Sequence, residues 1–365
     1  MFARRTLLAG LLLALVACKG NESPAPGPAA ADTAPAAKKD ESISLTGAGA
    51  TFPYPLYSKW ISEYNKQNPN VKINYQSIGS GGGIRQITAN TVDFGATDAP
   101  MKEDEAKHAP GKLFHIPATI GAVVVAYNVP EVTGTLKLAP EVLVGIYAGK
   151  IKRWNDPKIK ADNADAKLPA KDIAVIYRTD GSGTTAVFTD YLGKVSPEWK
   201  EKVGVGKVVN WPTGLGAKGN EGVTGQVKTT PYTIGYIERA YASQNKLPMA
   251  ELKNKAGKFV APSIEAMSAA ADAVEMPEEL FVSLSDAEGE AVYPITSYSY
   301  LLVYENAKDP IKGEALAKYV WWGLHEGQKF SKDLDYAPIP AKVLAKVEAR
   351  LKELRSGDKK LLSGA

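Results

Sequence analysis

The sequence is poor in the residues that build metal centres and thiol chemistry. Its 365 residues include one cysteine, Cys18, and three histidines, His108, His115 and His325. A single cysteine cannot form an intramolecular disulfide, and the histidines lack the spacing typical of a zinc site. We therefore expect no metal site, no cofactor and no cysteine-based catalysis.

The sequence also has no large excess of either positive or negative charge. The formal net charge is +4, from 44 Lys and Arg against 40 Asp and Glu, and the chain has no dense basic run. Proteins that bind nucleic acid through bulk charge need such a run, so we expect no nucleic-acid partner. In contrast, 44% of the residues are hydrophobic, which is enough for a sizeable core, and the length suits two domains.

Two common enzyme signatures are missing. Ser182 is flanked directly by Gly181 and Gly183, so the GxSxG motif of hydrolases is not formed, and the chain has no GxxxxGK[ST] motif. We therefore expect no catalytic residues and interpret the chain as a binding protein rather than an enzyme.

The first 41 residues have the layout of an exported lipoprotein. Residues 1–17 contain a short basic start and the apolar run TLLAGLLLALVA, which is typical of a signal peptide. The run ends in LVAC, which resembles a bacterial lipobox, so we predict that Cys18 is acylated after cleavage. The Pro- and Ala-rich residues 18–41 would then tether the protein to a membrane. An ordinary signal peptide with an incidental cysteine is the alternative.

Strand and helix patterns alternate from Ser42 onward. Apolar residues at helical spacing predict helices over 55–67, 83–90, 141–149, 186–192 and 313–327, and strand patterns occupy 43–45, 71–76, 92–100, 114–129, 172–177 and 291–305. This alternation is typical of an α/β fold with largely parallel sheets. One layout has two α/β lobes, with the chain crossing over near residue 118 and returning near residue 295. Ligands of such folds bind in a cleft at the carboxyl ends of strands.

Three turns between a predicted strand and a predicted helix share one composition. GAGATF (47–52), IGSGGG (78–83) and DGSGTT (180–185) are rich in small residues and contain a hydroxyl residue. Helix N-termini and hydroxyl groups supply hydrogen-bond donors to anions. One turn alone is most simply an ordinary helix cap, but three turns together with Arg178 favour an anion site. Arg178 could instead form a surface ion pair with Asp180, and Asp98 could cap a turn.

Several longer motifs resemble one family. LTGAGATFPYPLYSKW, INYQSIGSGGGIRQI, DFGATDAPM and RTDGSGTTAVFTDYL closely resemble the phosphate-binding protein of phosphate-specific ABC importers. WPTGLGAKGNEGV, IGYIERAYA, YPITSYSYLLV and DLDYAPIP resemble it too, so the likeness runs from about Ser42 to about Val343. The resemblance implies a two-lobed periplasmic-binding-protein fold, with a ligand cleft between lobe I (42–118 and 296–365) and lobe II (119–295).

The resemblance also implies a function and a site. The chain would be a monomer that binds inorganic phosphate with high affinity outside the cytoplasm, in the periplasm or at the cell surface, and delivers it to an ABC permease. Asp98 would accept a hydrogen bond from protonated phosphate, and Asp180 would hold Arg178 in place. The other phosphate contacts implied by the motifs are Ala50, Thr51, Phe52, Ser80, Arg178, Ser182, Gly183 and Thr184.

One departure and three alternatives stay open. Many members of the family have a second serine where this chain has Gly81. The ligand could be another tetrahedral oxyanion, although Asp98 argues against sulfate. The chain could also be a phosphatase or phosphoryl-transfer enzyme with Ser182 or Asp98 as nucleophile, or a structural or adhesive surface lipoprotein.

Overall fold

The computed structural model describes residues 42–362, so the predicted signal peptide (1–17), the Cys18 lipidation site and the whole predicted linker (18–41) lie outside it. The helices are α1 Tyr54–Gln67, α2 Ser80–Thr88, α3 Glu103–Lys107, α4 Pro140–Tyr147, α5 Pro157–Asp162, α6 Gly183–Val195, α7 Pro197–Lys202, α8 Gly219–Thr229, α9 Arg239–Gln244, α10 Ile264–Ala273, α11 Pro310–Leu324 and α12 Ala341–Leu351. The strands are β1 Ile43–Gly49, β2 Val71–Ser77, β3 Phe94–Thr97, β4 Leu113–Asn128, β5 Lys137–Leu138, β6 Ala174–Arg178, β7 Leu215–Ala217, β8 Thr233–Glu238, β9 Glu251–Lys253, β10 Phe259–Val260, β11 Thr296–Tyr304, β12 Arg355–Ser356 and β13 Lys359–Lys360.

The central feature is an eight-stranded sheet in the order β2-β1-β3-β11-β4-β8-β6-β7. Strands β2, β1 and β3 are parallel to one another at one end of the sheet, and β8, β6 and β7 are parallel at the other. The middle pairs β3–β11, β11–β4 and β4–β8 are antiparallel. The predicted α/β fold is confirmed, but the largely parallel sheet is correct only for the two flanks. The centre differs because β11 comes from late in the chain and inserts between β3 and β4.

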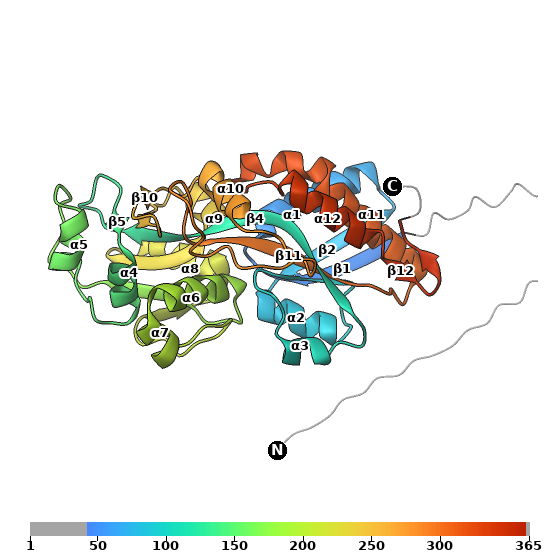
Figure 1. Ribbon diagram of the computed structural model, residues 1–365, viewed down its shortest axis with the longest axis horizontal. Helices are drawn as coiled ribbons and strands as arrows, with labels where there is room; N and C mark the ends of the chain where they lie inside the picture. Colours follow the sequence, from blue (N-terminus) through green and yellow to red (C-terminus); the bar gives the residue numbers. More distant parts are fainter. Residues whose placement is uncertain (1–41, 363–365) are drawn as a thin grey trace, which may run out of the picture. The chain divides into compact units, whose positions relative to one another are not determined.

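Strand β4 connects the two flanks of the sheet. It pairs with β11 from Leu113 to Ala122 and with β8 from Val123 to Asn128. Its residues are buried along nearly its whole length, because both faces are covered, and this explains the unbroken apolar run in the sequence. Figure 1 shows β4 and β11 running side by side through the middle of the folded body. One continuous strand thus pairs with the central strand β11 along its first part and with β8 of the second flank along its last part.

Helices cover both faces of the sheet near β1. On one face, Ala48 of β1 and Leu302 of β11 pack against Ile84 and Ile87 of α2. On the other face, α1 and α11 pack against the sheet and contribute aromatic side chains such as Tyr319, whose ring lies 6.3 Å from that of Phe94. This layered arrangement leaves the carboxyl ends of β1, β3 and β6 free to form a site.

Candidate anion site

The glycine-rich turns before α2 and α6 touch each other. The Gly81 amide donates a hydrogen bond to the Gly181 carbonyl at 2.8 Å, and a Cβ on Gly81 would lie only 3.1 Å from the Gly181 Cα. A side chain at either position would push the two backbones apart. The glycines therefore permit close contact between two turns that lie far apart in the sequence.

The start of α6 faces Ser80 and Asp98. A Cβ on Gly183 would come within 2.3 Å of the Ser80 hydroxyl and 2.4 Å of the Asp98 carboxylate. Because Gly183 and Thr184 are the first residues of the helix, their amide groups have no acceptor within it. The structure thus brings two unpaired helix amides next to a hydroxyl and a carboxyl group.

Ser182 caps this helix rather than standing free. Its hydroxyl accepts a hydrogen bond from the Thr185 amide at 3.0 Å, and its own amide donates to the Lys207 carbonyl at 2.9 Å. The Ser182 hydroxyl hydrogen is then its remaining donor.

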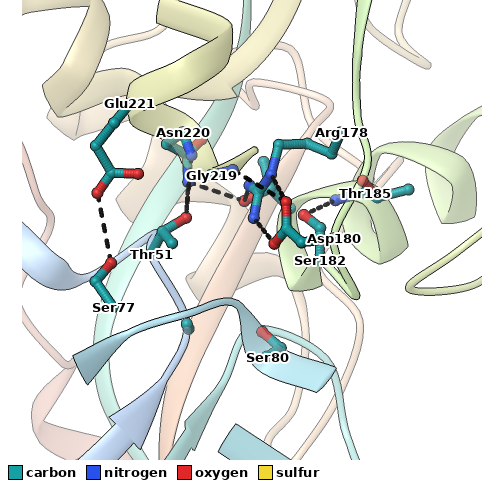
Figure 2. A network of polar contacts seen from close by, with 12 residues as sticks. Thr51, Ser77, Ser80, Arg178, Asp180, Ser182, Thr185, Gly219, Asn220 and Glu221 are labelled. Atoms are coloured by element: carbon teal, nitrogen blue, oxygen red, sulfur yellow. Dashed lines mark hydrogen bonds and ion pairs between the residues drawn. The ribbon is translucent and has the colours of Figure 1, made fainter. Parts of the chain in front are cut away.

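Arg178 ends β6 with a side chain that is only 1% exposed. Its Nε and Nη2 groups donate to the two carboxylate oxygens of Asp180 at 2.8 and 2.5 Å, and its Nη1 donates to the Thr184 hydroxyl at 3.3 Å. Figure 2 shows the arginine and Asp180 side chains facing each other in this way. Since a guanidinium has five N–H groups, one on each terminal nitrogen remains to bind a ligand.

Asp180 is in turn fixed by α8. One of its oxygens also accepts from the Gly219 amide at 3.0 Å. Burial raises the pKa of Asp180, but the hydrogen bonds and charge of Arg178 and the Gly219 amide outweigh it and hold the pKa below its ordinary value. Asp180 therefore stays ionised and orients the guanidinium.

Asp98 follows β3 and is almost completely buried. Its carboxylate accepts hydrogen bonds from Ser299 at 2.8 Å and Ser80 at 3.3 Å. Burial raises the pKa of Asp98 to about 7, against the opposing effects of the Ser299 hydrogen bond, the Arg178 charge and the Ser80 hydrogen bond. The group can therefore exchange a proton near neutral pH.

The turn 50–52 is held by three tyrosines. The hydroxyls of Tyr75, Tyr241 and Tyr336 donate to the carbonyls of residues 50, 51 and 52, at 2.8, 2.5 and 2.6 Å. In a trans peptide the N–H points opposite to the C=O, so the amides of Thr51 and Phe52 point away from these tyrosines. The Ala50 amide, in contrast, donates to the Ala96 carbonyl.

Two residues that the sequence did not single out complete the constellation. Ser299, on β11, binds Asp98. Asn220, on α8, donates to the hydroxyls of Thr51 and Thr184. For Ser299 the available signal was a buried polar residue among the tyrosines of a strand, and for Asn220 it was a position directly after Gly219 at the start of a helix.

The described residues offer no metal centre or membrane span. Within 42–362, no group of three or more His, Cys, Asp or Glu side chains could hold a metal ion. Over the same residues, no helix is both long and apolar enough to cross a bilayer.

Comparison with known proteins identifies the family. A family model described as a PBP superfamily domain matches residues 24–323. The phosphate-binding protein PstS of Pasteurella multocida is 51% identical over 324 residues, covering 87% of this chain and 93% of that protein. The PstS of Haemophilus influenzae is 48% identical over 312 residues, covering 85% and 92%. The chain belongs to the PBP superfamily and to its PstS family. The family predicted from the motifs is thereby confirmed.

Solved structures agree on the fold. A high-affinity periplasmic phosphate-binding protein (PfluDING) bound with phosphate matches with a TM-score of 0.69 and 20% identity, over 84% of this chain and 93% of that chain. The phosphate-binding protein of Stenotrophomonas maltophilia matches with a TM-score of 0.65 and 18% identity over the same shares. The PstS relatives are named for binding rather than catalysis, in agreement with the prediction that this family member is not an enzyme.

Proposed function

We propose that this protein binds inorganic phosphate outside the cytoplasm and delivers it to the permease of a phosphate ABC importer. The observation that carries the proposal is the meeting of a buried guanidinium, helix amides and hydroxyls with the carboxyl group of Asp98, while the Asp180 carboxylate is already bonded to the guanidinium. Protonated phosphate both accepts hydrogen bonds and donates one, so it suits many donors and one acceptor. The high identity to curated PstS proteins supports the same ligand.

Each group has a role in this proposal. Arg178 supplies two N–H groups and a positive charge to the phosphate, and Asp180 holds it in position. The helix starts contribute uncharged donors, as anion sites at helix N-termini generally do. Asp98 accepts from the P–OH group. The residues proposed to contact phosphate directly are Thr51, Phe52, Ser80, Asp98, Arg178, Ser182, Gly183 and Thr184, while Ala50 shapes the turn.

We also propose that the site lies between two lobes, 42–118 with 296–365 and 119–295. The change of partner along β4 after Ala122 and the hydrogen bond from the Val123 amide to the Ile295 carbonyl (2.8 Å) support chain crossings near these boundaries. Lys207 and Glu105, one from each proposed lobe, form an ion pair at 2.8 Å. Ligand would stabilise this closed arrangement because its donors come from both lobes.

Calorimetric titration of phosphate-stripped protein tests the ligand. Phosphate should bind tightly and sulfate weakly, because sulfate carries no proton for Asp98. Absence of phosphate binding would refute the proposed function. Preferential binding of sulfate would instead identify a different oxyanion as the ligand, and release of product from a phosphoester would indicate an enzyme.

The anchor is a separate part of the proposal. We propose that signal-peptide cleavage after residue 17 leaves an acylated Cys18, and that residues 18–41 tether a monomeric receptor to a membrane. Cys18→Ser should abolish lipidation, and the protein should then leave the membrane fraction or keep its signal peptide. Unchanged membrane fractionation of the variant at wild-type size would contradict the lipobox prediction.

A further inference from the structure

The orientation of the Asn220 side chain follows from one backbone contact. Asn220 is fully buried, and its Oδ1 lies 2.9 Å from the Glu238 amide nitrogen. A backbone N–H can only donate, so the amide atom that faces it must be the oxygen. The Nδ2 group, with its two hydrogens, must therefore face the opposite way.

Nδ2 meets two hydroxyl groups of the site. It lies 2.8 Å from the Thr51 hydroxyl and 3.2 Å from the Thr184 hydroxyl. Figure 2 shows the Asn220 side chain joined in this way to Thr51. Each of its two hydrogens can thus be given to one threonine.

The two hydroxyls then have no accepting capacity left. The Thr51 oxygen also accepts from the Asn220 backbone amide at 3.2 Å. The Thr184 oxygen also accepts from Nη1 of Arg178 at 3.3 Å. Since a hydroxyl has two lone pairs and one hydrogen, each threonine can only use its hydrogen, as a donor to a third partner.

We propose that Asn220 is a positioning residue that turns the hydroxyls of Thr51 and Thr184 into obligate donors toward the bound anion. The inference rests on the proposed phosphate-binding function, because it concerns the same site. A freely rotating hydroxyl can present a lone pair to the ligand and repel it. A hydroxyl whose lone pairs are already bonded cannot, so Asn220 keeps Asp98 as the single acceptor facing the phosphate.

The first test is a coupling measurement. Asn220→Ala should weaken phosphate binding by about tenfold, roughly the effect of one or two uncharged hydrogen bonds. In a Thr51→Val/Thr184→Val background the same substitution should change the affinity by less than about twofold, because the hydroxyls through which it acts are gone. An equal penalty in both backgrounds would overturn the inference and leave Asn220 a packing residue.

A matched control separates stability from positioning. Asn163 is also buried and hydrogen-bonded on both sides of its amide, to the backbone of Lys137 and Ile159. Asn163→Ala should lower the melting temperature without changing phosphate affinity. Failure of wild-type protein to bind phosphate would refute the proposed function, whereas tight wild-type binding with uncoupled variants would refute only the role of Asn220.

Neutron diffraction on phosphate-bound wild-type crystals gives a second test that needs no variant. The hydroxyl hydrogens of Thr51 and Thr184 should both point away from Asn220. A hydrogen on either hydroxyl directed at the Asn220 side chain would overturn the inference.

Discussion

Replacing Asp98 by asparagine should change how stability depends on pH. In the ligand-free protein, burial raises the pKa of this carboxyl from 3.8 to about 7. The folded state therefore holds a proton that the unfolded chain has lost, and stability falls as pH rises through this window. Asparagine has nearly the same shape, and its amide can still bond to both serines, but it does not titrate.

The magnitude follows from the two pKa values. A difference of one in pKa corresponds to about 1.4 kcal/mol. The stability conferred by this group should be fully present below about pH 4, and about 4 kcal/mol of it should be lost by about pH 8. The free energy of unfolding of Asp98→Asn relative to wild type should rise by that amount over this range.

Urea denaturation of phosphate-stripped protein at a series of pH values measures this difference directly, because the titration of all other groups cancels between the two proteins. Asp172→Asn is a suitable control, since the Asp172 side chain is 82% exposed. A difference between Asp98→Asn and wild type that stays constant with pH would show that the carboxyl is ionised throughout, and the reasoning from burial would be wrong.

The same variant should alter ligand choice. A buried carboxylate accepts a hydrogen bond from phosphate and repels the fully ionised sulfate, and sites built around a ligand hydroxyl can discriminate by about 10⁴ or more. Asparagine can turn a donor toward either ion. The preference for phosphate over sulfate should therefore shrink by at least about a hundredfold in competitive titrations, and an unchanged preference would place the discrimination elsewhere.

Three further predictions concern the arginine, the start of α6 and the ion pair between the proposed lobes. Arg178→Ala should cost about 2–5 kcal/mol of phosphate binding by titration, because two charge-assisted hydrogen bonds to the phosphate are lost and the uncompensated charge of Asp180 would repel the anion. Gly183→Ala should weaken binding by about tenfold to a hundredfold, because its Cβ would overlap the Ser80 hydroxyl. Lys207→Met should lower affinity by about fivefold and reduce its salt dependence, because the ion pair with Glu105 would join the two proposed lobes in a closed form.

Exposed positions provide controls for these three variants. Arg153→Ala removes an exposed arginine, Gly225→Ala places a Cβ in open space and Lys150→Met breaks an exposed ion pair. None of them should change phosphate affinity. A site variant that behaves like its control would contradict the role given to that residue.

Local patterns in the sequence predict most elements of this fold. The helix expected over 55–67 is α1, and the strand expected over 172–177 corresponds to β6 with a shift of one or two residues. The turn predicted at 47–52 begins later, because Gly47 to Gly49 continue β1 by pairing with β2 and β3. The position of β11 between β3 and β4 depends on pairing between distant segments, which no local pattern contains.

The residues of the candidate site also fall into two groups, those that a local sequence pattern predicts and those that depend on contacts between distant segments. Each glycine turn has a signature that is complete within a few residues, and Arg178 and Asp180 lie beside one of these turns, so the sequence predicts them. Ser299 and Asn220 acquire their contacts only when strand β11 and helix α8 are brought to the turns. Nothing adjacent to either residue in the sequence indicates which group it will meet.

The place of β11 in the sheet also bears on biosynthesis. Strands β1 to β4 are made first, yet β3 and β4 are joined only by β11, which is residues 296–304. On the ribosome, where domains otherwise tend to fold from the N-terminus onward, this half of the sheet must stay incomplete until the chain is almost finished. If the protein is exported as proposed, this late completion would keep strands β1 to β3 out of a finished sheet while a translocation channel threads them.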